Sequence, residues 1–111
     1  MTITTLIGLT GEQIDRARKD FEHEYFQLEE ITRHYAERMR RRDVKRDIMC
    51  RLAYATPVTD WDKYQRRWAK LDELDRHDER DRKRWHAGTN RLIALNTRWN
   101  AMTAELKEAT A

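Results

Sequence analysis

Residues that interrupt regular structure are scarce in this sequence. Its 111 residues include only three glycines and one proline. An all-β domain needs frequent turns, and turns depend on these residue types, so this scarcity argues against a β-rich fold. Charged residues make up 39% of the chain, and high charge without turn residues is typical of long helices. The composition therefore predicts an all-α protein, and the length is that of one domain.

Cysteine is also rare, and long apolar runs are missing. Cys50 is the only cysteine, which excludes an internal disulfide, and we expect it to be a small buried side chain. No stretch approaches the 18 apolar residues that suggest a transmembrane helix. The first ten residues, MTITTLIGLT, lack the basic start and the apolar length of a signal peptide. We therefore expect a cytoplasmic protein without a membrane partner.

The residue patterns of common catalytic and metal sites do not occur in the sequence. Gly8, Gly11 and Gly88 are too far apart to form a phosphate-binding loop, and the four histidines show no HExxH spacing. His34 and Cys50 could be imagined as a nucleophile pair, but no third orienting group or oxyanion hole is recognisable. The sequence thus predicts a protein that is not an enzyme and needs no metal or cofactor.

Residues 1–9 are expected to form a short extended arm before a helix over residues 10–54. Thr10 and Gln13 match a capping box, in which each side chain accepts a hydrogen bond from the backbone of the other. Leu9 and Ile14 are placed to form the hydrophobic staple around it. The apolar residues that follow recur at the spacing of one helix face. They are Ile14, Ala17, Phe21, Leu28, Ile31 and Tyr35.

The apolar face of this first helix changes direction after Met39. The next apolar residues are Val44, Ile48 and Leu52, and at ~100° per residue they lie on about the opposite side of the helix. The helix is therefore expected to kink or break near Arg40–Asp43, or its second half meets a different partner.

A loop is predicted at Pro57, because proline disfavours helix at the residue before it. Thr59 is then the expected N-cap of a second helix over residues 59–107. This helix carries a seven-residue repeat of apolar residues, which is typical of coiled coils. The repeat has three exceptions: Asp78, Asp81 and Gly88. Glycine suits a helix end, so a break near residue 88 is a further expectation.

Two helical tracts of similar length flank the loop and favour an antiparallel hairpin. A lone hairpin covers only part of each apolar stripe. The predicted fold class is therefore all-α, a long antiparallel helical hairpin folded into a three- or four-helix, coiled-coil-like bundle with a short extended N-terminal arm. A homodimer of hairpins is the alternative. The whole chain, residues 1–111, is expected to form a single helical domain.

Charge is unevenly distributed along the chain. Residues 12–30 carry seven acids and three bases, whereas residues 40–70 carry ten bases and four acids. The basic segment forms the loop end of a hairpin and also holds several aromatic residues. Arginine and aromatic side chains dominate protein interfaces, and bases beside aromatic rings also suit nucleic acid. The residues predicted to contact a partner are Arg40, Arg41, Arg42, Lys45, Arg46, Arg51, Tyr54, Trp61, Lys63, Arg66 and Arg67.

Three functional hypotheses follow from these patterns. The preferred one is a small non-enzymatic binding protein, an inhibitor or adaptor that docks on a larger protein or nucleoprotein. A mobile-element product that blocks a host complex handling nucleic acid would be an example. The second is a nucleic-acid-binding module that uses the basic aromatic end, although four aspartates are interleaved with its bases. The third is a structural coiled coil that assembles with itself.

Overall fold

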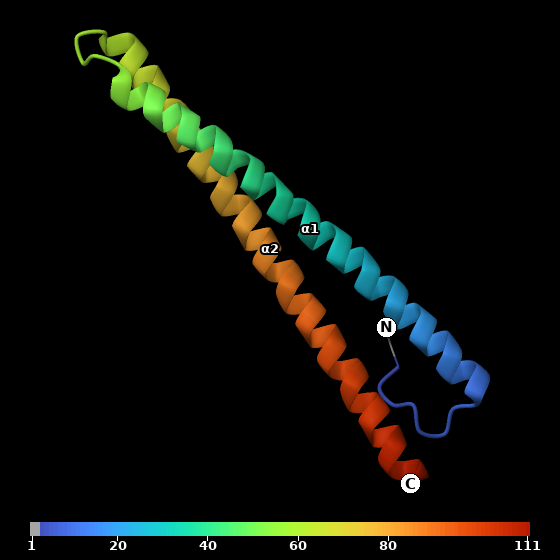
Figure 1. The fold of residues 1–111 in the computed structure, drawn as a ribbon. Coiled ribbons are helices and arrows are strands. Elements are labelled where there is room, and N and C mark those ends of the chain that lie inside the picture. Colours follow the sequence, from blue (N-terminus) through green and yellow to red (C-terminus); the bar gives the residue numbers. More distant parts are fainter. Residues whose placement is uncertain (1–2) are drawn as a thin grey trace. The chain divides into compact units, whose positions relative to one another are not determined.

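The computed structural model describes residues 3–111, which contain two long helices (Figure 1). Helix α1 spans Gly11–Ala55 and helix α2 spans Trp61–Thr110. No strand occurs in residues 3–111, so the prediction of an all-α protein is confirmed. The third or fourth helix of the predicted bundle is not found in this range. Neither expected break is present, because α1 continues through Arg40–Asp43 and α2 continues through Gly88.

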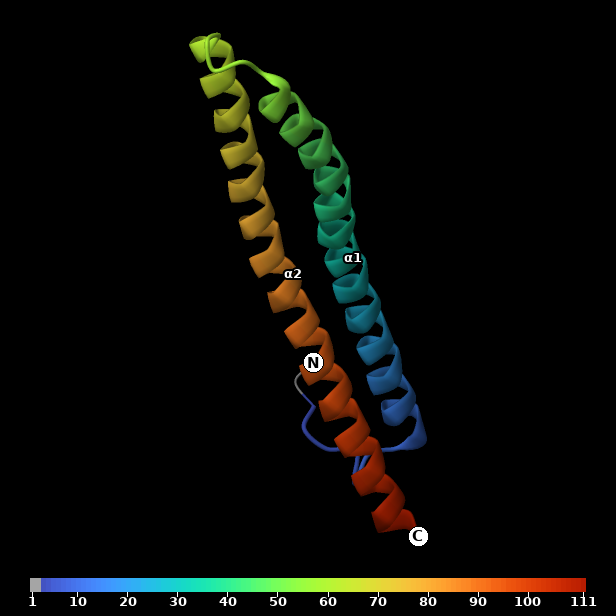
Figure 2. The same cartoon turned by 60° about the vertical axis from the view of Figure 1, so that its left-hand side comes forward.

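Both helices contribute to two separate units of the structure. One unit contains the chain up to Thr32 together with Ala87–Ala111, and the other is Arg33–His86. Within the second unit, α1 and α2 run antiparallel on either side of the loop over residues 56–60 (Figure 2). The predicted antiparallel pairing around Pro57 is therefore present in this unit.

In the first unit, α1 begins with the predicted capping box. The Gln13 backbone N–H donates to Thr10 Oγ1 at 3.2 Å, and the Thr10 N–H donates to Gln13 Oε1 at 2.9 Å. These bonds satisfy backbone donors that have no partner within the helix. Leu9 and Ile14 both pack against the core of this unit, as the staple requires.

The core of the first unit is assembled from the arm and both helices. Its buried residues are Leu6, Ala17, Trp99 and Met102. Leu6 is only 1% exposed, so the arm packs into the core as expected. The ring of Phe21 stacks on Trp99, with ring centroids 5.0 Å apart and planes inclined by 11°. Such a pair adds to the free energy gained from burying the two rings.

Polar contacts and one turn hold the arm against α2. Arg98 Nη2 donates to the carbonyl oxygen of Ile3 at 3.1 Å, and Thr5 Oγ1 donates to Glu105 Oε1 at 3.0 Å. Gly8 has a φ of 83°, which is unfavourable for residues with a side chain. The glycine thus allows the chain to turn between the arm and α1.

Gly88 is a point of close approach between the two helices of the first unit rather than a helix end. A Cβ atom at this position would lie 2.5 Å from Thr32 Oγ1. Thr32 is buried, and its hydroxyl donates to the carbonyl oxygen of Leu28 at 2.7 Å. The absence of a side chain at residue 88 is therefore required by packing, which is why this residue interrupts the apolar repeat.

We expect Gly88→Ala to lower the free energy of unfolding by about 1–2 kcal/mol, because the added methyl group overpacks the contact with Thr32. Alanine favours the helix by about 1 kcal/mol over glycine. Once the clash with Thr32 is removed, Gly88→Ala should therefore raise the free energy of unfolding instead of lowering it. In a Thr32→Ala background, Gly88→Ala should stabilise the protein by about that amount. Urea unfolding followed by circular dichroism measures both effects. A more stable Gly88→Ala single variant would contradict the close approach.

In the second unit, local hydrogen bonds form the connection between the helices. Thr56 Oγ1 donates to the carbonyl oxygen of Leu52 at 2.7 Å, near the end of α1. The Tyr64 N–H donates to the carbonyl oxygen of Asp60 at 2.9 Å, which begins the hydrogen bonding of α2. Asp60, rather than the predicted Thr59, is therefore the residue directly before the helix.

The seam between α1 and α2 in this unit keeps an unbroken helical spacing. Its α1 side continues from Tyr35 and Met39 through two partly buried arginines to Ala53, which is fully buried. Its α2 side contains Leu71 and Leu74, followed by the buried Asp78 and Asp81. Because polar residues occupy the centre of the seam, α1 does not need to break where its apolar face ends.

Candidate functional site

All eleven residues predicted to contact a partner lie in the second unit, residues 33–86. The structure separates them into three groups. Arg42 and Arg46 face α2, whereas the side chains of Arg40, Arg41, Lys45 and Arg51 are exposed. The remaining residues lie at the hairpin end, around the loop. About twelve helical residues, or ~18 Å at 1.5 Å per residue, separate Arg42 from Tyr54. The arginines of residues 40–42 and the aromatic end therefore do not form one surface.

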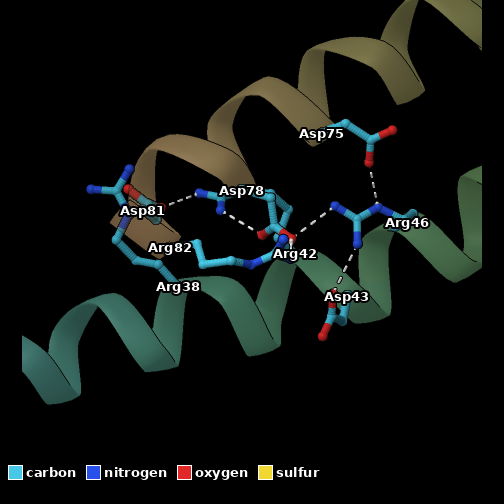
Figure 3. Close-up of polar contacts among 8 residues, drawn as sticks. All are labelled: Arg38, Arg42, Asp43, Arg46, Asp75, Asp78, Asp81 and Arg82. Carbon is cyan, nitrogen blue, oxygen red and sulfur yellow. Dashed lines mark hydrogen bonds and ion pairs between the residues drawn. The ribbon is translucent and has the colours of Figure 1, made fainter. Parts of the chain in front are cut away.

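The inward group belongs to a cluster of buried ion pairs (Figure 3). Arg42 donates from Nη1 to Asp78 Oδ1 at 2.9 Å and from Nη2 to Asp81 Oδ2 at 2.7 Å. Arg46 Nη2 donates to Asp78 Oδ2 at 3.0 Å. Arg38 Nε lies 3.2 Å from Asp81 Oδ2. The side chain of Arg42 is only 11% exposed, and the two carboxylates are buried, so water contributes little to their solvation.

The cluster remains ionised because its hydrogen bonds outweigh the effect of burial. Burial opposes the charged form of Asp78 and Asp81, but hydrogen bonds from the arginines lower the pKa of both carboxyl groups below the usual value. Burial likewise opposes the charge on Arg42, and its hydrogen bonds to the two aspartates raise its pKa overall. The guanidinium groups of Arg42 and Arg46 are thus engaged by aspartates of α2 and are not available as the sequence-based prediction required.

The sequence analysis did not predict this cluster, although two of its residues interrupt an apolar pattern. Asp78 and Asp81 are two polar exceptions in the apolar repeat of α2. Their partners become apparent when the hairpin is counted outward from its loop, since Arg42 and Asp78 each lie eighteen positions from Asp60. Opposite charges at matching positions on the facing sides of two helices would have predicted the pairs.

The second group forms an outward surface on α1, which we call the docking face. Its centre is a stripe of Val44, Ile48 and Leu52, which are 62%, 55% and 42% exposed. Four cations surround this stripe: Arg40, Arg41, Lys45 and Arg51. At 100° per residue, all seven residues lie within about 140° of the helix circumference. The apolar residues that predicted a second partner for α1 are thus not covered by α2.

Two acidic residues accompany the cations of the docking face. Glu37 forms an ion pair with Arg40 and lies 3.6 Å from Arg41, and Arg51 lies 3.1 Å from Asp47. Lys45 has no ion pair within residues 3–111. Exposed pairs of this kind contribute little to stability, so these cations can exchange partners without a large loss. The face is therefore positively charged around an apolar stripe.

The third group lies at the hairpin end, where four aromatic rings contact one another. Tyr54 packs edge-on against Trp68, with ring centroids 5.2 Å apart, and the Tyr64 centroid lies 6.1 Å from that of Trp68. Trp61 stacks on Tyr64 with a centroid distance of 5.8 Å. The two outer rings are well exposed, Tyr54 at 79% and Trp61 at 53%. The four rings therefore form a continuous row, and the exposed rings of Tyr54 and Trp61 lie at its two ends.

The three predicted cations of the hairpin end have different roles. Arg67 Nη1 donates to the carbonyl oxygen of Leu52 at 2.8 Å and also to Thr56 Oγ1. It therefore caps the end of α1, where carbonyl groups have no partner in the helix. Arg66 Nε donates to the carbonyl oxygen of Asp62 at 3.3 Å. Of the three, Lys63 alone has neither a hydrogen bond nor an ion pair within residues 3–111.

Comparisons of the chain with protein families, with curated proteins and with solved structures find no match. Among the described residues, no helix contains a segment long and apolar enough to cross a bilayer. Residues 3–111 also contain no group of three or more side chains arranged to bind a metal ion.

Proposed function

We propose that this protein is a non-enzymatic helical binding protein whose docking face binds an acidic surface of a larger protein. The observation that carries this proposal is the exposure of Val44, Ile48 and Leu52 as one stripe among cations. Large apolar side chains on one helix face favour association, because binding removes them from water. An inhibitor or an adaptor acts in this way, by occupying a surface of its partner.

The charge around the stripe supports an acidic partner. Four cations surround the apolar centre and outnumber the two carboxylates that pair with them, Glu37 and Asp47. This positive charge would speed the association of a negatively charged partner and would favour that partner over neutral or basic proteins. A cytoplasmic setting accords with the single thiol of Cys50, which has no disulfide partner in the chain.

The test compares proteins retained from lysate by the wild type, by Ile48→Asp and by the matched control Ile93→Asp. Ile93 lies on α2 in the first unit and is 59% exposed, similar to Ile48. One protein should be retained by the wild type and by the control, and its affinity for Ile48→Asp should be about 30-fold weaker, as expected for an interface hot spot. Circular dichroism should show equal helicity in all three proteins.

A second variant tests the charge complementarity. Arg51→Glu should weaken the same complex, mainly through slower association and with a strong dependence on salt. The proposal is wrong if Ile48→Asp and Ile93→Asp retain the same proteins as the wild type. It is also wrong if only nucleic acid is retained.

Two alternative functions have support from particular features. Nucleic acid is favoured by the exposed ring of Trp61, which stacks on Tyr64 beside Lys63. Self-association through the docking face would bury the same apolar stripe in a homodimer, and two helical hairpins would supply the four helices of the predicted bundle. Light scattering distinguishes this case, because a monomer at high concentration excludes it.

A further inference from the structure

One side of the second unit contains a groove between α1 and α2 that is rich in cations. Its volume is about 410 Å³, and five of its lining residues are basic. They are Arg38, Arg41, Arg42, Lys45 and Lys70. His77 and Leu74 also line this basic groove, and Glu73 is its only carboxylate.

A second groove in the same unit has the opposite balance of charge. This groove, of about 340 Å³, is lined by three carboxylates and two guanidinium groups. The residues are Arg46, Asp75, Asp78, Glu79 and Arg82. An overall excess of basic residues does not explain this difference, because both grooves lie between the same two helical segments. The cations are concentrated in the first groove, which gives it an excess of positive charge.

Several donors in the basic groove are available for a ligand. Lys45 has no ion pair in the described residues, and Arg41 is 80% exposed with only a 3.6 Å contact to Glu37. Arg38 is 44% exposed and uses Nε toward Asp81, so its ion pair leaves the two terminal nitrogens of the guanidinium group. Arg42, by contrast, is engaged by Asp78 and Asp81. Its side chain is only 11% exposed, so it offers little surface to a ligand.

Three cations of the groove lie in a row on α1, where residues 38, 41 and 45 are separated by about 4.5 and 6 Å along the helix axis. On α2, Lys70 adds a further cation, and the imidazole of His77 lies about 10.5 Å farther along that helix. Repeated cations at this spacing suit a ligand with several negative groups in line. Guanidinium and ammonium groups form short, strong hydrogen bonds with phosphate oxygens.

We propose that the basic groove binds a linear ligand carrying several phosphate groups. Two sources share this chemistry, the backbone of a single nucleic-acid strand and a free polyphosphate. The site is separate from the apolar stripe of the docking face, although Arg41 and Lys45 border both surfaces. The inference therefore goes beyond the proposed docking function and stands on the groove alone.

Glu73 limits the affinity of the groove for anions. Its carboxylate lies 3.4 Å from Lys70 Nζ and 3.8 Å from His77 Nε2. The hydrogen bond from Lys70 lowers the pKa of Glu73, so this carboxyl group is ionised at neutral pH. A bound phosphate would be repelled by Glu73 and would compete with it for Lys70.

The experiment titrates the full chain at low salt with two probes, a fluorescently labelled 12-nucleotide single strand and inorganic tripolyphosphate. Lys45→Gln should weaken binding about 3- to 10-fold, and for the strand it should reduce the salt dependence by about one ion. Glu73→Gln should strengthen binding by a similar factor, because it removes the repulsion. The matched control is Lys83→Gln, which removes a 78% exposed cation of the same unit that does not line the groove and should change affinity less than twofold.

The outcomes separate the two sources and the two proposals. Binding of both probes with the same response to the variants identifies the phosphate chain itself as the ligand, and binding of the strand alone identifies nucleic acid. Ile48→Ala removes apolar surface from the docking face without adding a charge near Lys45, so it should leave either affinity unchanged, and the docking face can fail its own test independently. Absence of binding at low salt overturns the inference. Equal losses for Lys45→Gln and Lys83→Gln, or no gain for Glu73→Gln, also overturn it.

Discussion

Replacing Asp81 with alanine is expected to lower the free energy of unfolding by about 3–5 kcal/mol, the range for removing one partner of a buried ion pair. Asp81 is only 1% exposed and accepts a hydrogen bond from Arg42 at 2.7 Å. Its removal leaves Arg42 in a nearly dry seam with Asp78 as its only remaining acidic partner, and Arg38 loses its ion pair. Urea unfolding followed by far-ultraviolet circular dichroism measures the loss.

The matched control for this variant is Asp72→Ala. Asp72 lies on the exposed side of the same helix, so its replacement should change the free energy of unfolding by less than about 0.5 kcal/mol. A loss for Asp81→Ala as small as that of the control would show that the buried aspartates contribute little to folding.

Acidification is the second change expected to have a large effect. Hydrogen bonds to the arginines hold the pKa of Asp78 and Asp81 below the usual value despite burial. Between the folded and unfolded pKa values, the unfolded chain therefore binds more protons than the folded chain, and stability rises with pH. The contribution of these groups is complete above the unfolded value of about 3.9. This contribution to stability is lost as the pH falls below that value and through the lower pKa values that Asp78 and Asp81 have in the folded protein.

The measurement is the urea midpoint as a function of pH from 6 to 2. The wild type should keep a constant contribution from the cluster above about pH 5 and lose it progressively in more acidic solution. Asp81→Ala should show a shallower decline, because one of the two titrating groups is gone. Asp72→Ala should follow the slope of the wild type. Parallel curves for wild type and Asp81→Ala would contradict the lowered pKa of Asp81.

Local features of the fold were predictable from sequence because their physical causes are local. The capping box at Thr10 joins residues three positions apart, and both of its hydrogen bonds are present. Pro57 restricts the residue before it, and the chain leaves α1 there. The apolar repeat of α2 follows from the helical period, and its buried members include Leu71, Leu74 and Trp99.

The predicted breaks failed for a shared reason. The change of apolar face after Met39 suggested a break near Arg40–Asp43, and Gly88 suggested another, but both helices continue. In each case the unusual residue is explained by the opposite helix. Arg42 is neutralised by aspartates of α2, and Gly88 makes room for Thr32. The residue pattern of one helix does not show which side chains of the other helix will lie opposite it.

The candidate surfaces were predicted in part. Residue type predicted a basic segment over residues 40–70, and helical spacing placed Val44, Ile48 and Leu52 on the side of α1 opposite Met39. Which of these cations face α2 and which face solvent could not be predicted. Helical spacing gives the position of each residue around its own helix, but it does not say which side of that helix is covered by the other. Arg46 faces α2, while Arg51 faces solvent. Lys70 meets Arg38 across a groove only because the antiparallel pairing places them together.

The sequence by itself determined that this chain is helical, where α1 begins, where the helices are interrupted by the loop, and which repeat α2 presents to its neighbour. Only the tertiary structure decided that Asp78 and Asp81 are buried beside arginines, that Val44, Ile48 and Leu52 remain exposed, and that cations gather in one groove. Helix formation depends on residues within a few positions of one another. The burial of a charge or an apolar side chain depends on the alignment of two segments that are far apart in the chain.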